Sequence, residues 1–304
     1  MPRIVSLISS ATEIIHALGQ TPNQAGRSHE CDFPPEVAAL PVCTKPTIDI
    51  HADSREIDCA VKDRVRNALS VYEVFDDVLE RLQPTHIITQ TQCEVCAVSL
   101  RDVERSVASR LASRPQIVSL TPNSLADVWD DIRRVACSLD IAERGRDVVA
   151  QLQARMHAIS DQARAAGERP RVACIEWQEP LMSAGNWMPE LVEMAGGVDL
   201  LGEPGKHSGY LTWTELVKAD PEVIIVAPCG FDLARTEQQM YWLTDRPEWS
   251  KLRAVRNGRV YLGDGNQYFN RPGPRLLETL QILSEILHPE AFKPSFQGAG
   301  WQTP

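Results

Sequence analysis

Two cysteines in a C-x-x-C spacing, Cys93 and Cys96, have the residue type and the spacing of metal ligands. They stand in a polar loop directly after the apolar run 86–89, which predicts a short buried strand. A second polar loop carries His29 and Cys31. Thiolate and imidazole groups are the ligands that zinc prefers in proteins. If the two loops meet, these four residues make a complete ligand set, and zinc is the expected metal.

Other interpretations of these cysteines are open. Cys93 and Cys96 equally suit two reduced thiols at the start of a helix predicted over 97–111. A redox pair is a third interpretation, although the thioredoxin-like context of such pairs is missing. The chain has eight cysteines but is long enough to bury its own core, so we expect them to be reduced. Cys137 and Cys174 stand in apolar runs and are expected to be core thiols.

Large aromatic side chains gather in the second half of the chain, in loops that follow predicted strands. Trp177 ends one strand, Trp187 stands in the loop after it, and Tyr268 and Phe269 stand in a third loop. Aromatic rings in such loops suit a flat, partly apolar ligand that is held by stacking. Packing in the core is the alternative, and we favour it for two further tryptophans, Trp213 and Trp249.

Strand and helix patterns alternate along the chain, which predicts an α/β fold with parallel-rich sheets. Strands are expected over 3–8, 86–89, 116–120, 171–176, 223–227 and 260–262. Helices are expected over 9–18, 54–82, 189–195, 213–219 and 276–287, and a long helical segment over 124–167 breaks near Asp140 or Gly145. These elements predict an N-terminal α/β lobe (3–122), a connecting helical segment (123–167), a C-terminal α/β lobe (168–290) and an irregular tail (291–304).

Composition excludes some classes of partner. The net charge of −10 argues against binding to nucleic acid. No apolar run approaches the ~20 residues that a helix needs to cross a bilayer, so we expect no insertion into a membrane. Met1 leads almost at once into the first strand, without a signal-peptide pattern. This predicts a cytoplasmic protein, or a periplasmic one if a leader has been removed.

Enzyme signatures are missing from the sequence. There is no G-x-S-x-G, H-E-x-x-H, Walker A or G-x-G-x-x-G pattern. Glu176 and Glu179 form a pair of carboxylates after a predicted strand, but strand alternation and solvation of the loop explain them equally well. The sequence therefore predicts binding without catalysis.

Several motifs, taken together and in this order, resemble the cobalamin-binding members of the iron-siderophore and cobalamin substrate-binding proteins of ABC importers (class III). They span about residues 3–288. The motifs are the segments 3–13, 31–35, 196–197, 219–224 and 268–275. The resemblance implies two α/β lobes joined by one long helix, with the ligand in the cleft between them. It also implies a corrinoid such as cobalamin, or a similar metal chelate, and no catalysis.

The resemblance also implies which residues contact the ligand. They come from loops that follow strands: Ser9, Ser10, Ser28, His29, Glu30, Gln90, Gln92, Cys93, Trp177, Trp187, Tyr268 and Phe269. Exported members dock an ABC permease through an acidic residue on each lobe, whereas this chain has Asn270 and Arg271 after its aromatic pair. On the first lobe, Asp76 or Asp77 is a candidate for that role.

Two alternatives to a corrinoid binder stay open. One is a protein that binds a soft metal ion or another metal chelate through the four residues His29, Cys31, Cys93 and Cys96. The other is an enzyme that acts on a corrinoid or tetrapyrrole, with Glu176 as its acid/base. The cysteines and His29 are not general to the resembled family, so they also suit ligation of the cobalt of a corrinoid.

Overall fold

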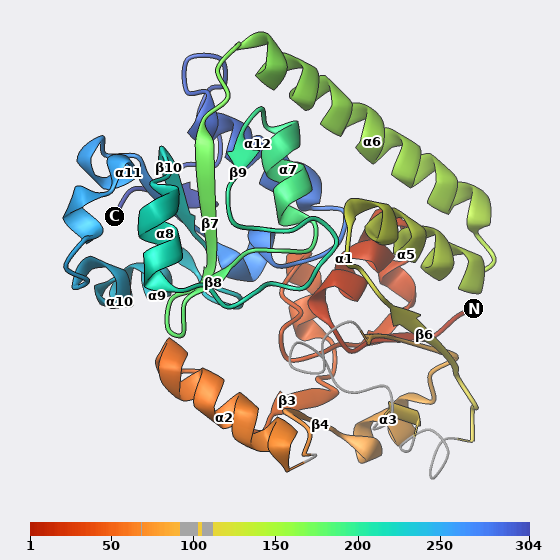
Figure 1. Cartoon of the computed structure of the whole chain (residues 1–304). Coiled ribbons are helices and arrows are strands. Elements are labelled where there is room, and N and C mark those ends of the chain that lie inside the picture. The colour runs from red at the N-terminus through yellow and green to blue at the C-terminus, as the bar shows by residue number, and fades with distance from the viewer. Residues whose placement is uncertain (68, 92–102, 105–111) are drawn as a thin grey trace. The chain divides into compact units, whose positions relative to one another are not determined.

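The computed structural model describes residues 1–67, 69–91, 103–104 and 112–304, and the chain folds into two compact units (Figure 1). The first unit comprises Met1–Ala52, Glu56–Pro122 and Ala126–Gln151. The second comprises Asp53–Arg55, Asn123–Leu125 and Leu152–Pro304. Both units are α/β with parallel-rich sheets, which confirms the predicted fold class. The division falls inside the long helical segment that the sequence predicts as a connector.

The described part of the first unit contains a four-stranded sheet in the order β2-β1-β5-β6. Its strands are β1 (Ile4–Ser6), β2 (Gln24–Gly26), β5 (His86–Gln90) and β6 (Gln116–Leu120). All neighbouring pairs are parallel. The apolar side chains of Val5, Leu7 and Ile87 are buried together with Leu79 of a covering helix. The predicted bounds of β6 are confirmed, and β5 is one residue longer than predicted.

A second, two-stranded sheet corrects the prediction for residues 54–82. The sequence predicted mostly helix there, but only α2 (Ser54–Arg66) and α3 (Asp76–Leu82) are helical. Between them, β4 (Tyr72–Val74) pairs antiparallel with β3 (Thr44–Pro46). The helical spacing of Val74, Val78 and Leu82 misled the prediction, because a three-residue strand is too short to show a period of two. The β3–β4 sheet carries Thr44 and Tyr72.

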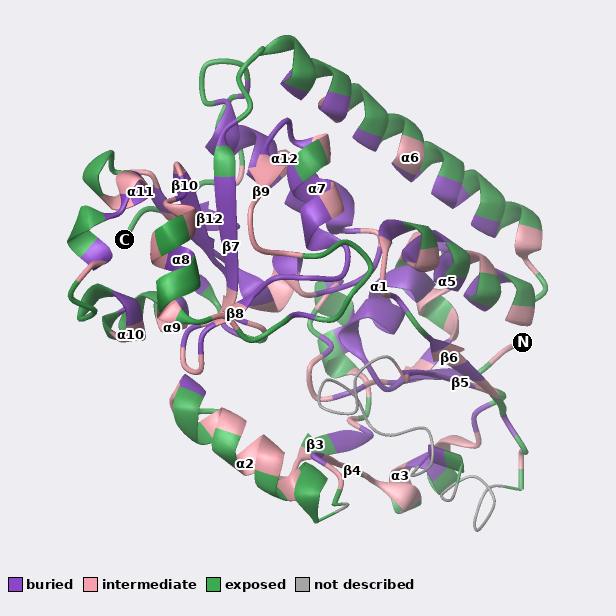
Figure 2. Cartoon of the chain, in the orientation of Figure 1, coloured by how far each residue is buried: buried purple, intermediate pink, exposed green. Residues whose placement is uncertain are grey.

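The helical segment after β6 breaks where the sequence predicts it. Helix α5 (Leu125–Ser138) and helix α6 (Ala142–Ala165) are separated by a turn in which Asp140 has a positive φ of 58°. Figure 2 shows a buried stripe along one side of α6, which agrees with the predicted apolar spacing of Val148, Leu152 and Met156. The expectation of a core thiol at Cys137 is wrong, because the residue lies on the exposed face of α5. Cys174 is buried as expected.

The remaining short helices of the first unit connect its strands. They are α1 (Ser9–Ala17), η1 (Thr21–Asn23) and η2 (Pro35–Ala39). Helix α1 follows β1 directly and ends before Gly19, whose φ of +74° is the left-handed conformation expected of a helix stop.

The second unit contains a six-stranded sheet in which β12, β11, β10, β7 and β8 follow one another and β9 pairs with β7. The strands are β7 (Arg171–Trp177), β8 (Met182–Ser183), β9 (Val198–Asp199), β10 (Val223–Val226), β11 (Val260–Gly263) and β12 (Trp301–Gln302). The pairs β7–β10 and β10–β11 are parallel. Every residue of β10 is buried, as expected for a parallel strand that is covered on both faces.

Helices cover this sheet. They are α7 (Met188–Met194), α8 (Trp213–Ala219), α9 (Leu233–Gln238), α10 (Tyr241–Thr244), η3 (Trp249–Lys251), α11 (Arg253–Arg256), η4 (Gly265–Phe269) and α12 (Leu276–Leu287). The bounds of α8 and α12 are those predicted. Trp249 belongs to a buried hydrophobic cluster of this unit, and the partly buried Trp213 packs against it, which confirms their assignment to the core. The tail is not wholly irregular, because β12 pairs antiparallel with β11.

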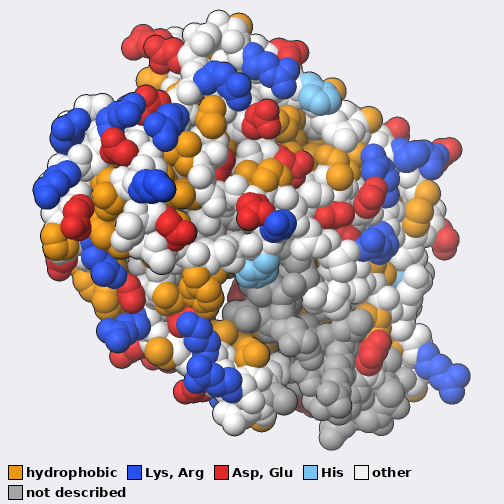
Figure 3. Space-filling model, in the orientation of Figure 1, with side chains coloured by type: hydrophobic (Ala, Val, Ile, Leu, Met, Phe, Trp, Pro, Cys, Tyr) orange, Lys and Arg blue, Asp and Glu red, His pale blue; other side chains and the backbone are white. Residues whose placement is uncertain are grey.

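Among the described residues, none of the helices combines the length and the apolar character required to span a bilayer. The face drawn in Figure 3 carries basic and acidic side chains that are interspersed, rather than one continuous basic surface.

Candidate functional site

The parallel strands of the first unit bring several predicted site residues to one edge of the sheet. The carboxyl end of β1 leads to Ser9 and Ser10, the end of β2 leads through Arg27 to Ser28, and β5 ends at Gln90. Because these strands are parallel neighbours, their carboxyl ends share an edge, and ligands of α/β proteins bind beyond such edges. Gln92, Cys93 and Cys96 lie outside the described residues, so their position in the site stays a prediction.

Ser9 and Ser10 begin helix α1 at this edge. Ser10 is fully buried, and no hydrogen-bond partner of its Oγ is found in the described ranges 1–67, 69–91, 103–104 and 112–304. Among the residues that the structure describes, no side chain forms a capping hydrogen bond at the start of α1. The first turn of a helix has backbone N–H groups without intrahelical acceptors. Hydroxyl and N–H donors therefore meet where the chain leaves β1.

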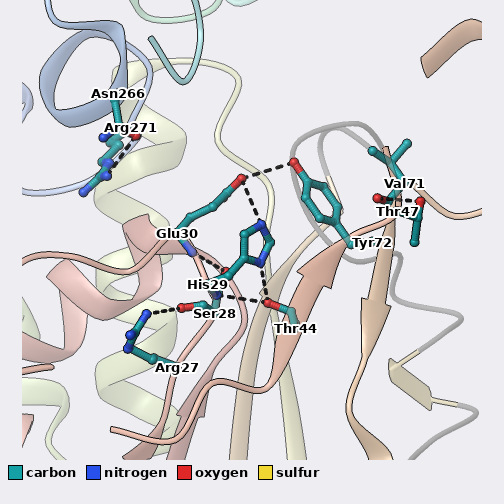
Figure 4. A network of polar contacts seen from close by, with 10 residues as sticks. All are labelled: Arg27, Ser28, His29, Glu30, Thr44, Thr47, Val71, Tyr72, Asn266 and Arg271. Atoms are coloured by element: carbon teal, nitrogen blue, oxygen red, sulfur yellow. Dashed lines mark hydrogen bonds and ion pairs between the residues drawn. The ribbon is translucent and has the colours of Figure 1, made fainter. Parts of the chain in front are cut away.

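His29 and Glu30 follow β2 and are held by the β3–β4 sheet (Figure 4). The backbone N–H of His29 donates to Oγ1 of Thr44 at 3.2 Å, and its Nδ1 lies 2.8 Å from the same oxygen. The hydroxyl of Tyr72 donates to Oε1 of Glu30 at 3.2 Å, and the rings of His29 and Tyr72 are 5.3 Å apart. Ser28 accepts the backbone N–H of Glu30 through its hydroxyl. Two strands thus fix both side chains.

The electrostatics of His29 keep it neutral. Burial, and secondarily the nearby Arg27 guanidinium, lower the pKa of His29 to about 4. The 3.8 Å contact between its Nε2 and Oε1 of Glu30 is therefore not an ion pair at neutral pH. No hydrogen-bond partner of Nε2 is found among the residues that the structure describes. A neutral imidazole with one bonded nitrogen is in the protonation state that metal ligation requires.

The Cys31 thiol lies in a buried polar cluster. Its Sγ accepts a hydrogen bond from Oγ1 of Thr12 at 3.0 Å and lies 3.9 Å from Oγ of Ser6. Burial raises the pKa of the Cys31 thiol, so it is protonated at neutral pH. Within the described ranges, no group of three or more His, Cys, Asp or Glu side chains is arranged to hold a metal ion. The predicted zinc site depends on cysteines that lie outside those ranges, and it stays a prediction.

In the second unit, Trp177 ends β7, Trp187 follows β8, and Tyr268 and Phe269 follow β11; these aromatic side chains differ in their exposure. Trp177 is half-buried, its indole N–H donates to the carbonyl of Ser54 at 3.0 Å, and its ring packs 5.2 Å from that of Phe231. Part of the Trp177 side chain is therefore accessible, although its indole nitrogen already donates a hydrogen bond to Ser54. The position agrees with a stacking role but leaves no free donor on this side chain.

Trp187, Tyr268 and Phe269 are packed more deeply than a ring that stacks on a ligand needs to be. The indole N–H of Trp187 donates to the carbonyl of Phe269 at 3.1 Å, and the exposed fractions of these two side chains are only 5% and 2%. Tyr268 lies beneath the guanidinium of Arg275, which is 4.4 Å from its ring centre. Within their own unit these residues shape the loop after β11. The sequence did not reveal this, because the contact joins positions 82 residues apart.

The structure also identifies participants that sequence reasoning missed. Thr44 and Tyr72 orient His29 and Glu30, but both lie in segments assigned to loop or helix. The β-branched and aromatic residues of 71–74 were the available signal for a strand there. Glu176, the candidate acid/base, accepts a hydrogen bond at 2.7 Å from Ser208, whose hydroxyl accepts the N–H of Gly185. The Glu176 carboxylate therefore has a structural role, as the acceptor of the Ser208 hydroxyl.

Comparison with known proteins agrees with this architecture. A family model described as periplasmic binding protein matches residues 4–266. One curated relative is the uncharacterized ABC transporter substrate-binding lipoprotein YvrC of Bacillus subtilis (strain 168). It is 21% identical over 295 residues, which make up 96% of this chain and 81% of the relative.

Two solved structures show the same fold over nearly the whole chain. The periplasmic heme-binding protein RhuT from Roseiflexus sp. RS-1, in its apo form, has a TM-score of 0.69 at 23% identity and covers 95% of this chain and 99% of its own. The periplasmic vitamin B12 binding protein BtuF of Vibrio cholerae has a TM-score of 0.66 at 19% identity and covers 95% and 97%.

Proposed function

The chain belongs to the periplasmic binding protein family, and we propose that within this family it binds a corrinoid such as cobalamin without changing it chemically. The curated relative is described as an ABC transporter substrate-binding lipoprotein, and the two similar structures are described as periplasmic binding proteins for heme and vitamin B12. The class of function is therefore binding of a small molecule for transport. The corrinoid is the specific proposal, and heme is the rival that the similar structures suggest.

The observation that carries the proposal is the set of residues at the carboxyl edge of the first sheet. Ser9, Ser10 and Ser28 lie there, all three buried, with the neutral and partly exposed imidazole of His29. Corrinoids display amide groups around a metal-containing ring, so hydroxyl and N–H groups suit their periphery and an imidazole suits their metal. In the second unit, Trp177 offers a partly exposed ring next to Phe231 for apolar contact.

Calorimetry with a panel of chelates tests the proposal. The panel is hydroxocobalamin, methylcobalamin, cobinamide, hemin and a ferric hydroxamate. We expect binding of the corrinoids, with an absorption spectrum that shows the same corrinoid before and after incubation. If hemin is the only chelate that gives heat, the proposed ligand becomes heme and not a corrinoid. New corrinoid species on incubation would favour the enzyme alternative, with Glu176 as the first residue to substitute.

A metal bound by the four soft ligands is a separate proposal with its own measurement. Four protein ligands make a closed, structural zinc site, so we expect about one zinc per chain by elemental analysis. Removal of zinc by a chelator then lowers the free energy of unfolding. A Cys93→Ser/Cys96→Ser variant should lose the metal, whereas Cys59→Ser, on the exposed side of α2, should keep it. Zinc-free wild-type protein, purified without chelators, contradicts the proposal.

A permease partner and a periplasmic location follow from the same family membership. The relatives are periplasmic proteins and a lipoprotein, which supports the periplasmic alternative and not the cytoplasmic expectation. Fractionation of cells that express the native gene checks this: we expect the protein in the periplasmic or membrane-attached fraction. Co-purification with an ABC permease tests the partner.

A further inference from the structure

A cavity of about 200 Å³ lies within the second unit, outside the residues that the sequence predicted to contact a ligand. Its walls come from the hairpin 178–181 that joins β7 and β8, from the start of α8, and from α10 with the turn that follows it (Figure 1). A second cavity of about 410 Å³ adjoins it, and Glu179, Trp242 and Arg246 line both. Sites for drug-sized ligands measure roughly 300–1,000 Å³, so the smaller cavity suits a molecule about the size of one amino acid.

One wall of the smaller cavity is apolar. Leu181 and Leu243 belong to the buried hydrophobic cluster of this unit, and the partly buried Leu211 and Trp213 pack against that cluster. The indole N–H of Trp213 donates to Oε2 of Glu248 at 2.9 Å, which fixes the orientation of the ring. An apolar wall that includes an oriented indole ring suits a flat apolar group.

Two residues that line the cavity carry a buried polar atom without a hydrogen-bond partner in the described part of the chain. Gln178 is only 1% exposed and donates from Nε2 to the carbonyl of Thr236 at 3.3 Å, but no described residue donates to its Oε1. The indole N–H of Trp242 has no acceptor among the same residues, although the ring packs 5.0 Å from that of Tyr241. Buried polar groups of proteins are nearly always hydrogen-bonded, so the two atoms indicate a place for an external acceptor and donor.

Charged side chains of both signs stand where the two cavities adjoin. Arg246 donates from Nη2 to Oε2 of Glu179 at 2.9 Å, and 43% and 22% of these side chains are exposed. Ion pairs near the surface contribute little to stability, so a ligand that offers each member a new partner can separate them at low cost. The guanidinium of Arg246 matches a ligand carboxylate, and the carboxylate of Glu179 matches a ligand ammonium.

We propose that this cavity binds an aromatic amino acid as its zwitterion. The ligand carboxylate accepts N–H groups of Arg246 and Trp242, and the ligand ammonium donates to Glu179 and to Oε1 of Gln178. The aromatic ring lies against the apolar wall beside Trp213. Such a ligand satisfies the buried donor and the buried acceptor and leaves the net charge of the site unchanged. The site lies within the second unit alone, so the proposal is independent of the corrinoid.

Nuclear magnetic resonance of the tryptophan indole N–H groups during titration with L-phenylalanine and L-tyrosine tests the proposal. The Trp242→Phe variant identifies the Trp242 resonance, which should move saturably with both amino acids. The resonance of Trp129, in the first unit, should stay in place. N-acetyl-L-phenylalanine lacks the ammonium and L-phenylalaninamide lacks the carboxylate, so each should bind about tenfold more weakly than L-phenylalanine.

Calorimetry with L-phenylalanine and matched variants assigns the binding to this cavity. Arg246→Gln and Trp242→Phe should each lower the affinity about tenfold, and circular dichroism confirms that the variants fold. Arg253→Gln should bind as wild type does, because Arg253 is a paired arginine of similar exposure that lines neither cavity. Absence of heat and of resonance shifts at millimolar amino acid would overturn the proposal and indicate ordered water as the partner of Gln178. Unchanged affinity in Arg246→Gln, or equal binding of N-acetyl-L-phenylalanine, would also overturn it.

Discussion

The indole N–H of Trp177 donates to the backbone carbonyl of Ser54, 123 residues earlier in the chain. Ser54 is buried, and its own N–H donates to Oε1 of Gln239 at 2.8 Å. All three residues belong to the second unit, although Ser54 begins helix α2, whose residues from Glu56 onward belong to the first. A side chain that the sequence indicates as ligand-facing thus also fixes the start of α2.

Trp177→Phe should lower the free energy of unfolding by about 1 kcal/mol, because the Ser54 carbonyl then loses a part-buried hydrogen bond. Urea unfolding measures the change. Trp242→Phe is the matched control, since the indole N–H of Trp242 has no hydrogen-bond partner in the described ranges of the chain. An equal loss in both variants would show that ring size, and not the hydrogen bond, determines the effect.

Asp131 predicts a pH dependence of stability. Burial raises the pKa of this carboxyl in α5 to about 7, although the Arg134 guanidinium and the N–H of Thr121 both act to lower it. The folded state then binds more protons than the unfolded state between about pH 4 and 7. The contribution of Asp131 to stability is therefore present below about pH 4 and is lost as the pH rises to about 7.

Asp131→Asn should flatten this part of the curve of unfolding free energy against pH, which chemical unfolding at successive pH values measures. The amide retains an oxygen for the Thr121 N–H. Asp130→Asn serves as the control, because Asp130 is exposed beside Arg133. Parallel curves for the wild type and Asp131→Asn would refute the raised pKa.

The side chain of Glu285 should hold the C-terminal tail, residues 291–304, in place. Its carboxylate accepts the N–H groups of Ser295 (3.0 Å) and Phe296 (3.1 Å) and the indole N–H of Trp301 (2.9 Å), and only 2% of the residue is exposed. Glu285→Ala leaves several donors without an acceptor and should cost about 3 kcal/mol or more. Limited proteolysis should then cleave within 291–304. Glu290→Ala, which is exposed, should behave as wild type.

Thiol reactivity should follow burial. Cys59 and Cys137 are exposed, whereas Cys31, Cys43 and Cys174 are buried and have raised pKa values because burial disfavours the thiolate. Brief alkylation of the native protein, mapped by peptide mass spectrometry, should modify the exposed pair first. Rapid modification of Cys31 would contradict the buried cluster with Thr12.

The sequence predicted elements best where local signals were complete. Helix α8 has a capping box between Thr212 and Glu215, and its bounds are those predicted. The start and end of α12 and β6 were also correct, because each has a continuous apolar pattern. The β3–β4 sheet was missed because its stability depends on pairing between segments about 28 residues apart, which no local period reveals.

The sequence predicted which loops form the site, but it did not predict which side chains contact one another there. Strand order at the carboxyl edge follows from the α/β pattern, so Ser9, Ser10 and His29 could be expected there. That Trp187 uses its N–H on Phe269, or that Thr44 orients His29, depends on packing between distant segments. Residue type alone could not separate an aromatic ring that faces a ligand from one that shapes a loop.

Strand β12 has a consequence for handling the protein. Its pairing with β11 at Leu262–Gln302 and Gly263–Trp301 occupies what would otherwise be an open edge of the second sheet. An open edge presents unpaired N–H and carbonyl groups to other chains and promotes aggregation. A truncation before Trp301 should therefore reduce the soluble yield, and an affinity tag is better separated from Gln302 by a flexible linker.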